Sequence, residues 1–255
     1  MFIDTHCHIH EADYPLDRDV TLKKAHDAHV MKMICVGTSE QSSEDALLFA
    51  GQHDGVYASI GVHPHDTKDG YDKIAELARN KSDRLVAIGE IGLDYYYNHS
   101  PRDIQVAALE SQIQTALEYD LPIIFHVREA FSDFWPVFDN FQSGSSKIRG
   151  VLHSFTDTQE NAEKAYERGL FIGANGISTF TKDAVEQRFF ASIPLDRLLL
   201  ETDAPFLTPK PYRGTINEPA FVSEVAKHHA ALRGISLESV ASATTANAMM
   251  LFQLG

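Results

Sequence analysis

The sequence predicts a (β/α)8 TIM barrel, an α/β fold built as a single domain over residues 1–255, and three observations support this prediction. One pattern recurs along the chain: a short apolar run ends in a polar residue, and a longer segment with helical spacing follows. The pattern occurs eight times, the number of strands that closes such a barrel. A length of 255 residues is one that α/β barrels reach as one domain. A doubly wound open sheet is disfavoured, because no glycine-rich phosphate-binding turn follows an early strand.

The expected strands are the eight apolar runs. In chain order they are Met1–His8, Met31–Gly37, Val56–His63, Leu85–Leu93, Pro122–Val127, Ile148–His153, Leu170–Ala174 and Arg197–Thr202. Strands that alternate with helices in this way indicate parallel β/α units. In a barrel the functional residues gather at the carboxyl ends of the strands, so the residues that end the runs are the candidates for a site.

The expected helices lie between the runs, where apolar residues recur at helical spacing. They are Asp19–Val30, Ser42–Gln52, Ile104–Glu118, Phe134–Phe141, Gln159–Arg168 and Ala184–Ser192, with Glu218–Leu232 and Leu237–Leu251 as closing helices. The second helix has its expected N-cap within Ser39 to Ser43. The longest helix places four apolar residues on one face: Val106, Leu109, Ile113 and Leu117.

Composition and charge limit the classes of function. The chain is 44% hydrophobic and 23% charged, as in an ordinary globular protein, and no run is long and apolar enough for a membrane span. No secretory signal is recognised, and Cys7 and Cys35 do not form a disulfide framework, so we expect a reducing cytoplasm and no membrane partner. The net charge of −14 excludes passive binding along a nucleic acid, so any polyanion must be attracted locally. Nothing indicates an obligatory protein partner.

The first strand carries a possible metal-binding pair, His6 and His8. Successive side chains of a strand point to opposite faces, so the two imidazoles share one face and Cys7 packs on the other. Two imidazoles on one face can hold a metal ion, although a pair of ordinary half-buried histidines is the alternative reading. The metal reading gains weight only if other strands end in ligand-type residues.

Other expected strands do end in such residues. They are His63, Glu90, His126 with Arg128, His153, and Glu201 with Asp203. Each one alone could be a hydrogen-bonded structural residue, but their coincidence at one rim favours a metal site. Imidazole and carboxylate ligands suit zinc, manganese, iron or nickel. The histidines of helical segments, such as His228 and His229, are assigned to the solvated faces of their helices.

Five motifs extend this pattern: Phe2-Ile3-Asp4-Thr5-His6-Cys7-His8, Gly61-Val62-His63-Pro64, Gly89-Glu90-Ile91-Gly92-Leu93-Asp94-Tyr95, His153-Ser154-Phe155 and Leu200-Glu201-Thr202-Asp203-Ala204-Pro205. As a set they resemble the motifs of the TatD family, metal-dependent deoxyribonucleases within the amidohydrolase superfamily. The resemblance continues through Asn217-Glu218-Pro219 to the closing Asn247 and Phe252. It therefore covers the whole chain.

The resemblance implies two divalent metal ions per subunit, with zinc, manganese and magnesium all possible. The six implied ligands comprise three for the first ion, two for the second and one carboxylate that bridges both: His6, His8 and Asp203; His126 and His153; and Glu90. A bridge by Glu90 is consistent with its chemistry, because a carboxylate has two oxygens and an imidazole nitrogen cannot bridge.

Further roles concern catalysis and substrate binding. Asp203 is the candidate general base, since a ligand carboxylate lies beside the reacting water, and Glu201 would orient a ligand. The resemblance places His63 and Arg128 where they would meet a substrate phosphate. The alternative for Arg128 is a salt bridge at the rim. The run Tyr95-Tyr96-Tyr97 could stack on exposed bases, with Tyr95 a candidate binding residue, or could pack its loop onto the rim.

Two departures from the family pattern remove possible phosphate contacts. Only Arg213 is basic in residues 213–217, and Tyr97 stands where a basic residue is common. The favoured function is still a metal-dependent hydrolase, a deoxyribonuclease of the 3′-5′ exonuclease type that acts on DNA or another phosphodiester. An amide or ester hydrolase on the same metal centre is the rival function, and a protein that holds metal structurally is a third.

Overall fold

The structure is a computed structural model and describes residues 1–80, 82–97, 99–142 and 147–255. Within these residues the strands are β1 (Phe2–Cys7), β2 (Val30–Val36), β3 (Val56–Ile60), β4 (Leu85–Asp94), β5 (Ile123–Arg128), β6 (Gly150–Leu152), β7 (Phe171–Ala174) and β8 (Leu198–Leu200). The helices are α1 (Arg18–Asp27), α2 (Glu40–Gln52), α3 (Lys73–Arg79), α4 (Arg102–Glu118), α5 (Phe131–Gln142), α6 (Gln159–Glu167), α7 (Ile177–Phe180), α8 (Ala184–Ser192), α9 (Val222–Arg233) and α10 (Leu237–Phe252). No helix of the described ranges combines the length and apolar character needed to cross a membrane.

The element order confirms the predicted fold class. Eight parallel strands follow one another in chain order and alternate with helices across the described chain, as in a (β/α)8 barrel. The expected cap of α2 is also confirmed, because the Ser39 side chain accepts a hydrogen bond from the backbone N–H of Ser42. The short helices α3 and α7 were not expected, since segments of seven and four residues are too short to show a helical period.

The chain divides into two compact units. The first comprises residues 1–35 and 154–255, and the second comprises residues 36–153. The single domain expected from the sequence stays a prediction.

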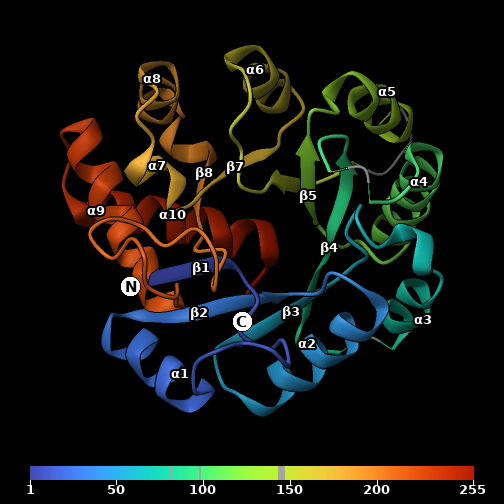
Figure 1. The fold of residues 1–255 in the computed structure, drawn as a ribbon, viewed down its shortest axis with the longest axis horizontal. Helices are drawn as coiled ribbons and strands as arrows, with labels where there is room; N and C mark the ends of the chain where they lie inside the picture. The colour runs from blue at the N-terminus through green and yellow to red at the C-terminus, as the bar shows by residue number, and fades with distance from the viewer. Residues whose placement is uncertain (81, 98, 143–146) are drawn as a thin grey trace. The chain divides into compact units, whose positions relative to one another are not determined.

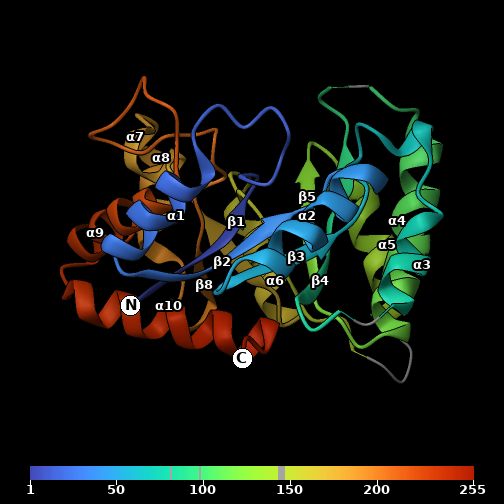
Figure 2. The ribbon, with the colours of Figure 1, turned by 90° about the horizontal axis from the view of Figure 1, so that it is seen from below.

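In the first unit, β1 pairs in parallel with β2, and β7 pairs in parallel with β8. The α10 helix lies along the amino end of β1, as Figure 2 shows in red and blue. It is fixed there by polar contacts, since Thr245 donates to the carbonyl of Met1 at 3.1 Å. The Asn247 amide donates to the carbonyls of Leu195 and Leu198 at 2.9 and 2.8 Å. The two bonds of Asn247 satisfy one carbonyl just before β8 and one at its first residue, and so anchor the strand that leads to Asp203.

In the second unit, β3 to β6 pair in parallel with one another, and α2 to α5 lie beside them (Figure 1). The α5 helix packs against β5 through aromatic rings, with Phe125 5.1 Å from Phe134 and 5.9 Å from Phe138 between ring centroids. All three rings are completely buried. Contacts of this kind fix β5 through dispersion and through exclusion of water.

The α4 helix departs from its expected apolar face. Leu109 and Ile113 are buried as predicted, but two glutamines are buried with them. The Gln105 amide accepts from the N–H of Asp94 at 2.8 Å and donates to its carbonyl at 3.1 Å. Gln112 makes the same pair of bonds to Val62, at 2.8 and 3.3 Å. These amides hold the chain at two strand ends, and hydrophobic periodicity does not reveal them.

The assignment of His229 to a solvated helix face is wrong. The side chain lies on α9 and is completely buried, and the Arg233 guanidinium donates to its Nδ1 at 3.1 Å. Burial, reinforced by the positive charge of Arg233, holds the pKa of His229 well below its usual value. The folded protein therefore keeps this ring neutral.

A pH dependence of stability follows. Below about pH 6.5 the unfolded chain binds a proton at His229 that the folded protein excludes, so stability is present above that pH and is lost as pH falls. A His229→Gln variant should show a shallower decrease in unfolding free energy between pH 7 and pH 5, by up to about 2 kcal/mol. Urea unfolding of the metal-free protein at several pH values measures this. His26→Gln, on the exposed face of α1, is the control, and identical slopes in all three proteins would contradict the assignment.

Candidate metal centre

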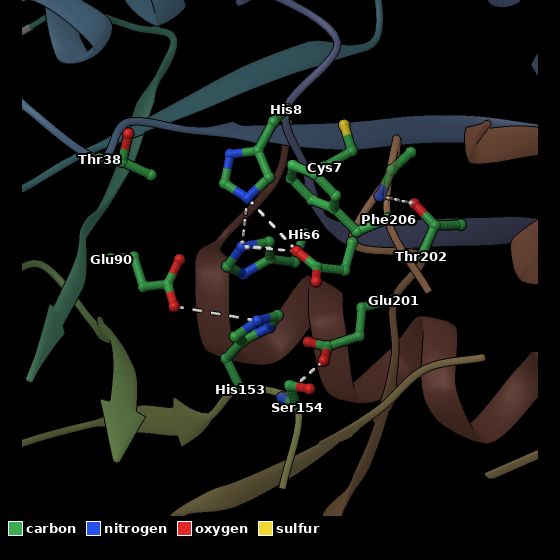
Figure 3. A network of polar contacts seen from close by, with 12 residues as sticks. His6, Cys7, His8, Thr38, Glu90, His153, Ser154, Glu201, Thr202 and Phe206 are labelled. Carbon is green, nitrogen blue, oxygen red and sulfur yellow. Dashed lines mark hydrogen bonds and ion pairs between the residues drawn. The ribbon is translucent and has the colours of Figure 1, made fainter. Parts of the chain in front are cut away.

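The end of β1 brings together three ligand-type side chains of the first unit. The Nε2 atoms of His6 and His8 lie 3.1 Å apart (Figure 3), and both rings are almost fully buried. The Asp203 carboxylate oxygen Oδ1 lies 3.7 Å from the Nε2 of His6 and 3.3 Å from that of His8. Two imidazoles from one strand face therefore converge with one carboxylate, as alternation along β1 predicted for the histidines.

Backbone pairing places Asp203 beside the two histidines. The N–H of Asp203 donates to the carbonyl of His6 at 2.8 Å, and the N–H of His8 donates to the carbonyl of Ala204 at 2.7 Å. Cys7 forms a parallel bridge with Ala204 at the same point. The segment after β8 thus continues as a short partner of β1, and the left-handed backbone of Asp203, with φ of 60°, turns its side chain there.

The buried carboxylate of Asp4 secures this pairing. Its two oxygens accept from the backbone N–H and the hydroxyl of Thr202, at 2.8 and 2.6 Å. Its Oδ1 also lies 3.3 Å from the backbone nitrogen of His6. Asp4 therefore joins β1 to the segment that carries Asp203, across a sequence separation of 198 residues.

The spacing of the three ligand atoms fits a small divalent cation. Four ligands about 2.1 Å from a tetrahedral ion lie about 3.4 Å from one another. The observed separations of 3.1, 3.3 and 3.7 Å bracket this value. Two facing imidazole nitrogens can pair with each other only when one donates and the other accepts, whereas both can bind a cation when neither carries a proton. The three residues therefore form a group that could hold a metal ion.

A second group lies around Glu90 in the second unit. Glu90 is buried on β4, and its Oε1 lies 2.7 Å from the Nδ1 of His126 on β5. The Nε2 atoms of His63 and His153 lie 3.7 and 3.9 Å from the same oxygen, and Figure 3 draws the His153 contact. His63, Glu90 and His126 form a group that could hold a metal ion.

Close packing of β4 on β5 makes this convergence possible. Gly92 pairs in register with His126, and a β-carbon on Gly92 would lie 1.8 Å from the His126 carbonyl oxygen. Any side chain at position 92 would force the strands apart, so glycine is required there. Burial, and then the proximity of His126, holds the pKa of His63 well below its usual value. A neutral imidazole is the form that binds metal.

Asp94, at the carboxyl end of β4, was not among the expected site residues. Its Oδ2 lies 3.1 Å from the Nε2 of His126 and 2.9 Å from the Nε2 of His65. Burial alone would raise the pKa of Asp94, but hydrogen bonds from His126, the backbone of Tyr97 and His65 lower it. The carboxylate is therefore ionised and orients the His126 ring, in the manner of carboxylates that support metal-binding histidines.

Comparison with known proteins places the chain in a family. The sequence profile of the TatD-related DNases matches residues 3–253. The chain belongs to the TatD-related DNase family. The uncharacterized metal-dependent hydrolase YabD of Bacillus subtilis is 36% identical over 258 residues, with all of both chains covered. The 3′-5′ ssDNA/RNA exonuclease TatD of Erwinia tasmaniensis is 38% identical over 247 residues, covering 93% of this chain and 94% of the relative.

The structural comparison agrees with this membership. The crystal structure of YjjV, a TatD homologue from Escherichia coli, superposes with a TM-score of 0.91 at 29% identity, covering 100% of this chain and 98% of that one. A TatD family protein from Entamoeba histolytica gives a TM-score of 0.89 at 24% identity, covering 100% and 98%. The (β/α)8 barrel expected from the eight apolar runs is confirmed.

The structure of this TatD-family chain also places the residues expected to orient a ligand or to bind substrate, which are Glu201, Arg128 and Tyr95. Glu201 is buried, and its Oε1 accepts from the N–H of Ser154 at 2.7 Å (Figure 3) and lies 3.5 Å from the Asn175 amide nitrogen. It thus fixes the residue that follows His153, which is consistent with the orienting role expected of it. Arg128 is exposed at the end of β5, and Tyr95 donates its hydroxyl to Asp133 at 2.8 Å.

The supporting residues Asp4, His65 and Asp94 were missed, although a signal existed for Asp94. Glu90, Gly92 and Asp94 alternate along β4, so Asp94 shares a strand face with Glu90. The motif that carries the TatD resemblance already contains it. Asp4 carried the same signal, since it alternates with His6 and His8 and stands in another of these motifs. His65 gave no comparable signal, because its role depends on Asp94, which is distant in the sequence.

The role of Asp94 leads to a prediction. Asp94→Asn keeps the shape of the side chain but removes one of its acceptor oxygens, so the His126 ring loses its fixed orientation. Affinity of the His63–Glu90–His126 group for zinc or manganese should fall about 10- to 100-fold. Metal analysis after equilibrium dialysis measures it, with circular dichroism to check the fold. The control is Asp133→Asn, which alters an exposed carboxylate of the same unit and should leave metal affinity unchanged. If Asp94→Asn bound metal as tightly as this control, the orienting role of Asp94 would be refuted.

Proposed function

We propose that this protein is a metal-dependent hydrolase that cleaves phosphodiester bonds, releasing nucleotides from the 3′ end of single-stranded DNA or RNA. The observation that carries the proposal is the convergence of imidazoles and carboxylates at the carboxyl ends of the strands, where barrel enzymes place their active sites. Membership of the TatD-related DNases supports it, as does a relative named a 3′-5′ ssDNA/RNA exonuclease.

We further propose that each of the two groups holds one divalent ion, which could be zinc, manganese or magnesium. Ions bound there would neutralise charge on a phosphate and make a water molecule more acidic. His6, His8 and Asp203 would hold one ion, and Glu90, His126 and His153 the other. His63 lies as close to Glu90 as His153 does, so it is a further candidate ligand beside its expected role with substrate.

The residues of the chain have distinct parts in the proposed reaction. The Asp203 carboxylate is held beside His8 and accepts the proton of the attacking water. Glu201 accepts from the backbone N–H of Ser154 and holds the backbone in place at that residue. Arg128, exposed at the end of β5, contacts a substrate phosphate, for which a planar guanidinium provides several donors.

The proposed setting is a reducing cytoplasm, with nucleic acid as the partner. Cys7 and Cys35 are both free and buried, so they form no crosslink that would require an oxidising compartment. Because the net charge is −14, the substrate would be attracted locally, by the proposed ions and Arg128.

Product analysis tests the function. Single-stranded DNA labelled at its 5′ end is incubated with manganese, magnesium or zinc, and stepwise shortening from the 3′ end is expected, with loss of activity in a chelator. Glu90→Ala should lose a metal ion and nearly all turnover while its fold is retained. Asp203→Asn, which removes the general base, should lower turnover about 10²- to 10⁴-fold.

Glu110→Ala is the matched control, since it removes an exposed carboxylate from α4 of the same unit. Its turnover should equal that of the unmodified protein. If a protein shown to hold both ions leaves DNA and RNA intact, the phosphodiesterase proposal fails. Turnover of a panel of esters and amides would then identify the rival hydrolase function.

A further inference from the structure

Two exposed tyrosines lie two and three residues after Asp94. Tyr96 and Tyr97 are 53% and 45% exposed, although aromatic side chains usually bury most of their surface. Their backbone is fixed, because the Asp94 Oδ1 accepts from the N–H of Tyr96 at 2.9 Å and from that of Tyr97 at 3.0 Å. The same carboxylate holds His126 through its other oxygen. The two rings are therefore anchored to a buried residue of the metal centre.

The Arg128 guanidinium lies against both rings. Its central carbon is 4.1 Å from the ring centroid of Tyr96 and 4.9 Å from that of Tyr97, within the range of cation–π contact. The pairing of β4 with β5 explains the position, since Asp94 and Arg128 are register partners. In the described ranges no hydrogen bond or ion pair engages the guanidinium. Its N–H donors are thus available at the edge of the aromatic pair.

A continuous series of ring contacts joins these tyrosines to the metal centre. Tyr97 and His99 stack with their planes 12° apart and centroids 5.8 Å apart, and both contact His65. His65 lies 4.3 Å from His63, and His63 lies 4.4 Å from His126, between ring centroids. Tyr97 is therefore separated from His63, an expected phosphate contact, by the single ring of His65.

Tyr95 differs from its two neighbours. Its hydroxyl donates to Asp133, and the central carbon of the Arg102 guanidinium lies 4.0 Å from its ring centroid. This ring holds the loop against α4 and α5, which is the packing role considered for the tyrosine run. Stacking on a ligand therefore falls to Tyr96 and Tyr97.

We propose that Tyr96, Tyr97, His99 and Arg128 form a stacking platform for an unpaired nucleobase of the substrate. The base next to the scissile phosphate stacks on the parts of the tyrosine rings that Arg128 and His99 leave exposed, and Arg128 donates to the phosphate of that nucleotide. The inference rests on the proposed phosphodiesterase function and adds a reason for preferring single-stranded nucleic acid. Every base has a π face, so such a platform tolerates any sequence, whereas a base inside a duplex is already stacked.

The chemistry of the platform favours a nucleic acid over other anions. A lone phosphate or carboxylate would be held by Arg128 and would gain nothing from the rings. Exposed aromatic rings beside a guanidinium are the combination that binds bases and phosphates together. The chain has a net charge of −14, so its overall charge does not attract a polyanion. The Arg128 guanidinium beside the two rings supplies a positive charge locally.

The test compares natural and abasic oligonucleotides. Fluorescence anisotropy gives the Kd of a 5′-labelled single strand and of the same strand with abasic nucleotides at its 3′ end, both in a chelator and with manganese. Tyr96→Ala/Tyr97→Ala should weaken binding of the natural strand about 5- to 100-fold and leave binding of the abasic strand unchanged. The Tyr96→Phe/Tyr97→Phe variant retains both rings and should bind as the unmodified protein does.

Tyr119→Ala is the matched control, because this half-buried tyrosine of the same unit follows α4, before the start of β5. The platform would be overturned if the double alanine variant lost affinity equally for natural and abasic strands, or lost affinity for neither. It would also be overturned if the unmodified protein bound the two strands equally well. The proposed function is judged separately by turnover. Cleavage with unaffected tyrosine variants refutes only the platform, whereas base-dependent binding without cleavage refutes only the hydrolase.

Discussion

The buried carboxylate of Asp94 is the interaction on which the second unit's candidate site depends. One of its oxygens accepts from the backbone at Tyr96 and Tyr97, and the other lies within hydrogen-bond distance of His65 and His126. A buried anion is tolerated only when such donors surround it. The donors that surround Asp94 include the ring of His126, a candidate metal ligand, and the backbone of the loop that carries Tyr96 and Tyr97. Metal binding and the proposed base stacking therefore share one anchor.

A second buried carboxylate has the corresponding role in the first unit. Asp4 accepts from the backbone and side chain of Thr202, and backbone pairing then places Asp203 beside His6. In both units a carboxylate that is not itself an expected metal ligand positions the residues that are. A metal site requires this arrangement, because its ligands must be oriented by hydrogen bonds from residues that do not themselves bind the ion.

Because the protein carries a net negative charge, the attraction of a phosphate depends on individual basic residues and on the candidate metal groups. Arg213, the basic residue that remains where the family often has several, lies 3.9 Å over the Phe180 ring and donates to the Thr208 carbonyl. It is therefore engaged within its own unit. Arg128 has no such hydrogen bond in the part of the chain that the structure describes. Attraction of a phosphate would thus be concentrated at the candidate metal groups and at Arg128, in agreement with a net charge of −14.

Local periodicity in the sequence was enough to predict the barrel class, the approximate strand positions and the placement of His6 and His8 on one strand face. The expected strands also supplied Glu90, His126, His153 and Asp203 as candidates, and motif resemblance assigned them as ligands. Contacts between residues distant in the sequence were needed to find that Asp94 holds His126, that Gln105 and Gln112 fix strand ends, and that His229 is buried. It also separated Tyr95, which packs, from Tyr96 and Tyr97, which are exposed. Three identical residues in a row carry the same local signal, and only their distant neighbours distinguish them.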